Sequence, residues 1–378
     1  MTNDEYITLK IKSFEFNLRE LAGSMGDFGT LFPLAIGYIA VCGLNPAGFL
    51  VMMGVANIVT GLLYRLPIPI EPMKVLAVVA IAQHWTPSMV YASGFGMGIV
   101  WTVFALIGVM KWIAKVTPDS VIRGIQVALG IILAIEAIKM ISTWWIIGVL
   151  SIITGLVLGR NRYAPAAIVL MALGLVIMIV KGQFNLVESP RLTLPIITGF
   201  SPREVWQSFL QAGFAQIPLT ATNAVIATSA LIKSYWPEKP VSESRLSLNM
   251  GIMNLILPFF GGMPLCHGAG GLAGQYYFGA RTGGANIIEG LIEIAMGLFL
   301  AGSIAGLFSV FPVAIIGAMM FLVGVELVKF ARGIHWDTDI IPMGTTLIVS
   351  LLTNMAYGFL SGFVVYYLIK SIPGRKNV

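Results

Sequence analysis

Charged residues are scarce in this chain of 378 amino acids. Asp, Glu, Lys and Arg make up 11% of it, whereas soluble domains carry about 25%. Hydrophobic residues make up 57%, and the mean hydropathy is +0.88. A soluble fold could not bury so much apolar surface. The composition therefore excludes a cytosolic enzyme, a nucleic-acid-binding protein and a disordered chain, and it favours an all-α polytopic membrane protein in a lipid bilayer.

Cysteine is also scarce, with two in the whole chain. Cys42 and Cys266 both lie in apolar stretches, so we expect no disulfide framework. The polar region 1–20 lacks the apolar core of a cleaved signal peptide. The sequence also lacks HExxH, GxxxxGKS/T and GxSxG, which mark zinc proteases, P-loop nucleotide sites and serine hydrolases. We therefore expect no enzyme activity, no cofactor and no resident metal.

Long runs without charge predict the membrane spans, since a span needs about 20 apolar residues. We predict fourteen segments: 22–42, 46–64, 72–84, 89–110, 118–138, 143–159, 163–180, 205–232, 245–260, 264–280, 285–304, 309–328, 338–353 and 356–370. The third and tenth are too short to cross alone, and each follows a proline-rich run, LPIPIEP at 66–72 and PFFGGMP at 258–264. Because proline disfavours helix in the residue before it, we expect short strand-like segments leading into half-helices.

The distribution of Lys and Arg predicts the orientation. With the N-terminus in the cytoplasm, 18 of the 23 basic residues fall inside, four fall outside, and Lys74 falls within the membrane. Basic residues concentrate in cytoplasmic loops, so this asymmetry supports the span count. We predict a multi-pass protein of the cell membrane with both termini in the cytoplasm.

A weak internal repeat divides the chain into halves. Asn57 precedes Pro72 by 15 residues, and Asn249 precedes Pro264 by 15. Each half holds seven predicted spans, and an odd number inserts the second half upside down relative to the first. Inverted repeats with interrupted helices at matching positions indicate the binding site of a secondary transporter.

The two interrupted segments predict an anion site. Pro72 and Pro264 suit the first position of a helix, so the next backbone N–H groups would be unpaired at mid-membrane. Each helix N-terminus contributes roughly +0.5 of a charge, and with Lys74 the sum is about +2. A tetrahedral dianion would fit this site. The alternative is a pair of buried kinks with no ligand.

Two more segments are expected to face this site. The first helix carries Asp27 and Thr30 in ELAGSMGDFGTLFP, and the eighth carries Gln216 and Asn223 in AQIPLTATN. Hydrogen bonding between helices is the alternative role for these side chains. The predicted substrate-binding residues are Met73, Lys74, Val75, Cys266, His267, Gly268, Gln216, Asn223 and Thr30.

Four acidic residues are candidates for ion coupling, because a charge inside a membrane is by default a functional hypothesis. Glu71 either pairs with Lys74 or takes up a proton when the anion binds. Asp27 is either a helix-end residue or a proton or cation site. Glu289 and Glu293 are four residues apart on the eleventh helix. They form either a relay or, for Glu289, a salt bridge at the inner end.

Four long motifs carry a resemblance. ELAGSMGDFGTLFP, LPIPIEPMK, AQIPLTATN and PLCHGAGGLAGQYYFGARTGG resemble the hallmark segments of the molybdate transporter family, which is related to sulfate permeases. The similarity spans residues 20–284 in order. It implies high-affinity uptake of molybdate, with sulfate and tungstate as close analogues. The family usually has Gln where this chain has Glu71, which bears on ion coupling more than on substrate class.

The related sulfate permeases and nucleobase carriers imply a core domain and a gate domain that work by alternating access. The core would comprise residues 1–110 and 205–304, and the gate 111–204 and 305–378. The resemblance implies a secondary transporter, with protons as the expected co-transported ion and a homodimer as one assembly.

Other functions stay open at this stage. A carrier of the same fold could take sulfate, tungstate or a nucleobase, although a nucleobase would call for carboxylates where Gln216, Asn223 and His267 stand. A membrane-embedded lipid-phosphate enzyme would need an acidic metal cluster at a membrane face, and none is visible. A channel is a further alternative, but paired broken helices around one site favour a transporter.

Overall fold

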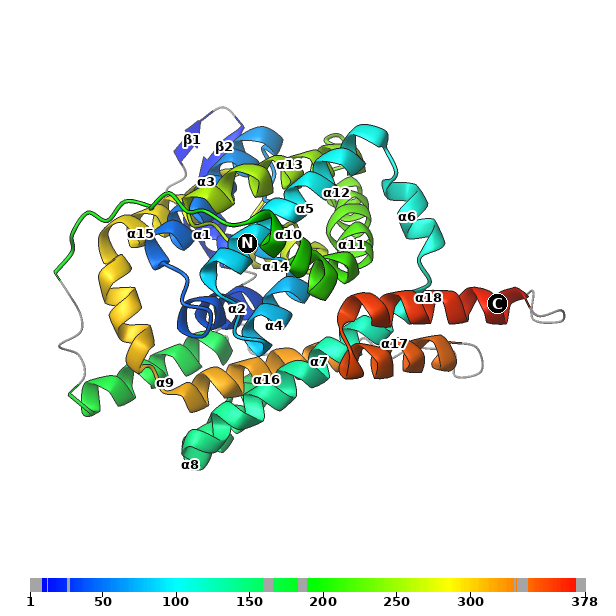
Figure 1. Cartoon of the computed structure of the whole chain (residues 1–378). Coiled ribbons are helices and arrows are strands. Elements are labelled where there is room, and N and C mark those ends of the chain that lie inside the picture. The colour runs from blue at the N-terminus through cyan, green and yellow to red at the C-terminus, as the bar shows by residue number, and fades with distance from the viewer. Residues whose placement is uncertain are drawn as a thin grey trace.

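The computed structural model describes residues 9–11, 13–25, 28–158, 166–182, 189–329, 331 and 339–371. Helices account for most of them, and the strands form two short antiparallel pairs (Figure 1). Helices suit an apolar environment because they pair nearly all backbone N–H and C=O groups within one segment.

The first half of the chain begins with a hairpin and continues as helices. Its elements are β1 (Leu9–Ile11), β2 (Phe14–Phe16), α1 (Leu18–Ser24), α2 (Phe28–Ala40), α3 (Pro46–Tyr64), β3 (Glu71–Pro72), α4 (Lys74–Ala82), α5 (Pro87–Ile107), α6 (Met110–Val116), α7 (Asp119–Ile141), α8 (Trp145–Leu158) and α9 (Ala166–Val180). A single 3-10 turn, Ser142–Trp144, separates α7 from α8. The chain folds back there, because Gly148 lies against Ile141, whereas seven residues of straight helix span about 10 Å.

The second half begins with one continuous helix, Pro202–Tyr235. Two π-helical segments, Phe209–Gly213 and Thr220–Ala227, interrupt its α-helical hydrogen bonding. Such segments are frequent at functional sites. The elements of this half are α10 (Pro202–Ser208), α11 (Phe214–Leu219), α12 (Thr228–Tyr235), α13 (Glu243–Ile256), β4 (Leu265–Cys266), α14 (Ala269–Phe278), α15 (Gly284–Val310), α16 (Val313–Lys329), α17 (Ile340–Leu352) and α18 (Met355–Ser371).

Several helices are long and apolar enough to cross a membrane. Among the described residues, five stretches qualify by length and composition: Pro46–Tyr64, Pro87–Ile107, Asp119–Val157, Pro202–Tyr235 and Gly284–Leu307. Val313–Val325 and Ile340–Leu352 are shorter apolar helices. This agrees with the mainly helical membrane protein that the composition predicts.

Some predicted boundaries are wrong. The first segment, 22–42, is split, because α1 ends where the Met25 N–H bonds back to the Gly23 carbonyl. The eleventh segment continues beyond residue 304 to Val310. It ends there because the following Pro312 forces Phe311 into an extended conformation.

The strand-like segments expected before the two short helices are present. β3 pairs antiparallel with β4, with Glu71 opposite Cys266 and Pro72 opposite Leu265. The Met73 N–H extends the pairing by donating to the Pro264 carbonyl at 3.0 Å. The chain then enters α4 on one side and α14 on the other. Both short helices therefore start from one two-stranded ladder.

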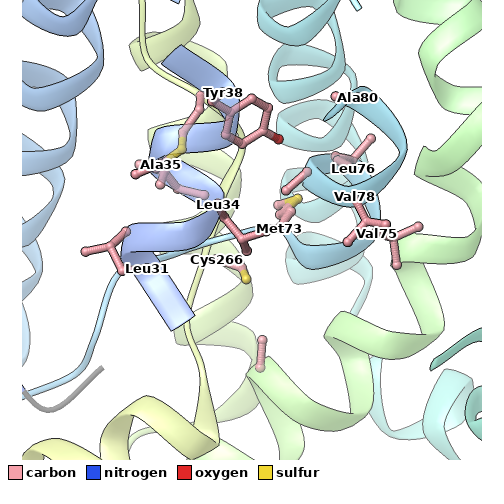
Figure 2. Close-up of a cluster of buried hydrophobic side chains, with 14 of the residues drawn as sticks. Leu31, Leu34, Ala35, Tyr38, Met73, Val75, Leu76, Val78, Ala80 and Cys266 are labelled. Atoms are coloured by element: carbon pink, nitrogen blue, oxygen red, sulfur yellow. The ribbon is translucent and has the colours of Figure 1, made fainter. Parts of the chain in front are cut away.

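Apolar side chains surround α4. Figure 2 shows Leu34 and Tyr38 of α2 beside Met73 and Leu76, which are all buried. The side chains of Val75 and Cys266 are buried as well. The side chains of Met73, Val75 and Cys266 therefore lie in the apolar core, and the Met73 N–H is already paired with the Pro264 carbonyl.

The motif at 20–33 packs against the motif at 264–284. Backbone N–H groups of Arg281 and Thr282 both donate to Oε1 of Glu20 at 3.0 Å. Burial raises the pKa of the Glu20 carboxyl, and these hydrogen bonds oppose that rise. A Cβ at Gly23 would collide with Ala280, so α1 needs a glycine there to come this close.

Two groups of helices are visible in Figure 1. α7 packs with α16, α17 and α18, while α3 packs with α15 and α5 packs with α13. Between the groups, α4 and α2 contact α7 and α16 respectively. The β3–β4 ladder belongs to the second group.

Candidate functional site

The N-terminus of α4 is capped by a side chain from another helix. Lys74 is the first residue of α4, and Met73 before it has an extended backbone and supplies no side-chain cap. Instead, Oε1 of Gln216 accepts hydrogen bonds from the N–H groups of Val75 at 2.8 Å and Leu76 at 3.3 Å. Caps usually come from the residue beside the helix, whereas this one lies 141 residues from Val75.

Gln216 is held in this orientation by its own helix. Its Nε2 donates to Oγ1 of Thr220 at 2.5 Å, and the residue is 2% exposed. Gln216 lies between the two π-helical segments. The amide therefore directs a neutral oxygen at the positive end of α4.

The N-terminus of α14 faces a carboxylate. Gly268, which precedes α14, supplies no side-chain cap. The carboxyl group of Glu71 lies against Gly268 and Gly271, where a Cβ on either glycine would collide with it. Glu71 is 2% exposed, and its Oε2 lies 3.4 Å from Nζ of Lys74. A carboxylate is stabilised at a helix N-terminus by the unpaired N–H groups and the helix dipole.

Two polar side chains hold the extended segments in place. Nδ1 of His267 lies 3.2 Å from the Pro69 carbonyl, and the His267 ring packs edge-on against Tyr64. Asn254 of α13 brackets β4, because its Nδ2 donates to the Leu265 carbonyl and its Oδ1 accepts from the Leu265 N–H. Sequence reasoning missed Asn254, and the available signal was an Asn within an apolar span.

A buried chain of amides connects α15 to the proline-rich run. Nδ2 of Asn57 donates to Oε2 of Glu293 at 2.9 Å. Nδ2 of Asn286 donates both to Oδ1 of Asn57 at 3.1 Å and to the Ile68 carbonyl at 2.7 Å. Sequence reasoning missed Asn286, because nothing in the chain shows which span faces it.

Glu289 lies near the same chain. Its Oε2 accepts from Nε2 of Gln275 at 3.4 Å, and both residues are buried. Within the described ranges, no group of three or more His, Cys, Asp or Glu side chains is placed to hold a metal ion.

Comparison with known proteins decides the family. The family profile described as "Molybdate transporter of MFS superfamily" matches residues 19–133 and 208–327. The chain belongs to the molybdate transporter family. Its two matched regions contain every site residue described above.

The similarity to other molybdate transporters extends over nearly the whole chain. Molybdate transporter 1 of Arabidopsis thaliana is 31% identical, over 94% of this chain and 89% of the relative. The fold resembles the transmembrane domain of the cyanobacterial bicarbonate transporter BicA, with a TM-score of 0.68, 16% identity and coverage of 94% and 98%. It also resembles the murine anion transporter Slc26a9, with a TM-score of 0.69, 12% identity and coverage of 96% and 69%.

In this family member the predicted site residues fall into distinct groups. Asp27 lies outside the described residues, and of Thr30 only the backbone, within α2, is described. Asn223 lies half-buried in the second π-helical segment. The structure brings together Lys74 and Gln216 at α4 with Glu71, His267 and Gly268 at α14.

A separate cavity of about 220 Å³ lies at the C-terminal end of α4. Oε1 of Glu136 on α7 lies 3.5 Å from Nε2 of His84, and its Oε2 lies 2.9 Å from Nζ of Lys139. His84 follows α4 with a φ of 52°, an uncommon value outside glycine. These groups connect the end of α4 to the helix group that contains α7.

Proposed function

We propose that the protein imports molybdate and binds it at the N-terminus of α4. The main support is the position of Gln216 Oε1. It accepts hydrogen bonds from two N–H groups in the first turn of α4, next to Lys74. An oxygen of a tetrahedral oxyanion can replace a neutral amide oxygen there. The anion then gains the field of the helix end and the charge of Lys74. The relatives named as molybdate transporters support this substrate.

The two short helices are not equivalent in this proposal. The end of α14 already faces the Glu71 carboxylate, which would repel a second anion. At the end of α4, the N–H groups of Val75 and Leu76 instead donate to a neutral amide oxygen. The sequence predicted a site charge of about +2 from two helix ends and Lys74. With one helix end and Lys74, the charge is about +1.5, and Glu71 partly offsets it.

We propose proton coupling on energetic grounds. Moving one elementary charge against a membrane potential costs about 2.3 kcal/mol per 100 mV, so a dianion costs about 4.6 kcal/mol at 100 mV. Two protons per dianion would cancel this cost, and a third would let the potential drive uptake. Import against the potential therefore needs a co-transported cation or an exported anion, and we propose protons as the cation.

We further propose alternating access between the predicted core and gate in a fourteen-segment, inverted-repeat arrangement. The two packing groups of helices and the likeness to BicA and Slc26a9 support this arrangement. The basic residues of the sequence support cytoplasmic termini in the cell membrane.

Uptake of radiolabelled molybdate into proteoliposomes, with tungstate and sulfate as competitors, tests the proposed function. We expect saturable uptake that an inward proton gradient stimulates. Sulfate transport without competition by molybdate would assign the chain to the sulfate alternative. No saturable binding or uptake of any of the three anions would overturn the proposed site.

A further inference from the structure

One carboxyl group inside a membrane-length helix has no role in anion binding. Glu293 lies within the apolar stretch Gly284–Leu307 and is 7% exposed. Its side chain accepts a hydrogen bond from Nδ2 of Asn57 at 2.9 Å. In the described part of the chain, no ion pair connects Glu293 to a basic residue.

The surroundings of Glu293 favour its neutral form. Burying an ionised carboxylate is costly unless it is paired, and one amide donor is little compensation. The protonated acid needs no countercharge. The free energy of the buried Glu293 side chain therefore differs strongly between its protonated and ionised forms. A site that couples proton binding to transport needs such a difference.

Charged groups near Glu293 are few. Glu289, about one turn earlier on α15, is the nearest along the helix. α3 and α2, which pack against α15, contain no Asp, Glu, Lys or Arg. α1 and β2 also pack against α15, and Glu20 of α1 accepts from the N–H groups of Arg281 and Thr282 in the turn before α15. The titratable groups on these packed elements are Tyr38, Tyr64, Glu15, Arg19 and Glu20.

A hydrogen-bond path leads from Glu293 to the extended segment before β3. Asn57 contacts Asn286, and Asn286 donates to the Ile68 carbonyl at 2.7 Å. Ile68 lies three residues before Glu71, in the run that forms β3. The charge on Glu293 changes the strength of its bond from Asn57, because hydrogen bonds to ionised groups are stronger. The amides can transmit that change to the segment that positions β3.

We infer that Glu293 binds one of the protons that accompany the anion, and that Asn57 and Asn286 couple it to the β3 segment. This inference rests on the proposed molybdate transport. The proton comes from the external water and binds the Glu293 carboxylate. It leaves to the cytoplasmic water after the anion is released. Glu71 then serves as the partner of Lys74.

The Glu293→Gln variant of the full chain in proteoliposomes tests the inference. Gln keeps an acceptor for Asn57 but cannot titrate. With one co-transported proton, a gradient of one pH unit can raise the ratio of internal to external molybdate about tenfold. We expect the variant to lose about this factor in pH-driven uptake, and to lose molybdate-dependent proton uptake at this site. Exchange of internal for external molybdate should stay within about twofold of wild type, because exchange needs no net proton movement.

Matched variants separate coupling from folding. Glu289→Gln, about one turn away, should keep pH-driven accumulation, and Glu293→Asp should keep part of it because it can still titrate. Wild-type accumulation by Glu293→Gln would overturn the inference, as would loss of molybdate exchange in both Glu293 variants. A wild-type dependence on Na⁺ in place of protons would also overturn it. Failure of wild type to transport molybdate would instead overturn the proposed function.

Discussion

Lys74 is the charged residue on which the proposed site depends most directly. Its side chain is 26% exposed, so solvent weakens its field compared with a fully buried cation. We expect Lys74→Ala to weaken molybdate binding by about 2 kcal/mol, or about 30-fold, the lower end for truncating one partner of a charge pair. Titration calorimetry on purified protein measures this change.

The matched control for that substitution is Lys181→Ala. Lys181 lies over the ring of Trp144, at 4.2 Å from its centroid, in the loop after α9. Its loss should leave molybdate affinity unchanged. Equal molybdate affinities for Lys74→Ala and wild type would show that Lys74 does not contribute to the anion site.

Gln216 gives a second test at the scale of a single side chain. Gln216→Glu would place a tethered carboxylate on the N–H groups of Val75 and Leu76, where the oxyanion is proposed to bind. We expect molybdate affinity to fall at least about tenfold. A negative charge at a helix N-terminus is favourable by about 0.3–1 kcal/mol, which offsets part of the cost of burying this carboxylate in the apo protein. Binding and thermal-unfolding curves separate the two effects, and unchanged affinity would place the anion elsewhere.

The chemistry of these residues could be predicted from sequence, but their directions could not. Lys74, Glu71 and Gln216 stand out because each is polar in an apolar stretch. No local pattern shows that the Gln216 amide points at α4 or that Glu71 lies against Gly268, since both contacts join distant segments. The predicted equivalence of the two half-helices failed to anticipate this difference.

At the scale of helices, the α3–α15 contact requires glycine on both sides. A Cβ at Gly54 would meet the Gly290 carbonyl, and one at Gly290 would meet the Gly54 carbonyl. We expect Gly290→Ala to destabilise the protein by about 1–3 kcal/mol, the usual cost of overpacking. It should also loosen the bond between Asn57 and Glu293, which spans the same contact. Thermal unfolding in detergent measures the loss.

The control for this substitution is Gly344→Ala on α17. A Cβ there meets nothing within 4 Å. Alanine in an open helical position should be neutral or stabilising by about 0.4–1 kcal/mol. A similar loss for both variants would show that α3 and α15 tolerate separation.

Elements were predictable where local chemistry determines them. Prolines at 67, 69 and 72 indicated an extended segment before α4, and β3 is found there. The pairing of β3 with β4 adds what the sequence could not show, namely that the two segments meet. α6 was not expected, because its seven residues are too short to give a clear pattern.

At the scale of the molecule, orientation can be measured by cysteine labelling. Thr86→Cys and Thr353→Cys are exposed positions that we expect to react from outside the cell, and Pro240→Cys should react only from inside. The native Cys42 and Cys266 are buried and should stay silent. Labelling of position 240 from outside would contradict the inverted-repeat topology.

The His84–Glu136–Lys139 cluster connects the two helix groups beside the cavity. We expect Glu136→Gln to favour opening at this face by about 1 kcal/mol, or about fivefold, as partly exposed ion pairs are weak. The modification rate of a cysteine at Ser350, which lines the cavity, measures the opening. An unchanged rate would show that the cluster does not restrain the two groups.

The pairing of β3 with β4 also sets an order of events in biosynthesis. Pro72 and Cys266 are 194 residues apart, so at about 5–20 residues per second the first strand waits about 10–40 s for its partner. Lys74 and Glu71 are only three residues apart and can pair at once. The first half of the nascent chain thus carries a countercharge for Lys74 into the bilayer. The Lys74–Glu71 ion pair therefore neutralises the lysine during insertion, before any anion is present.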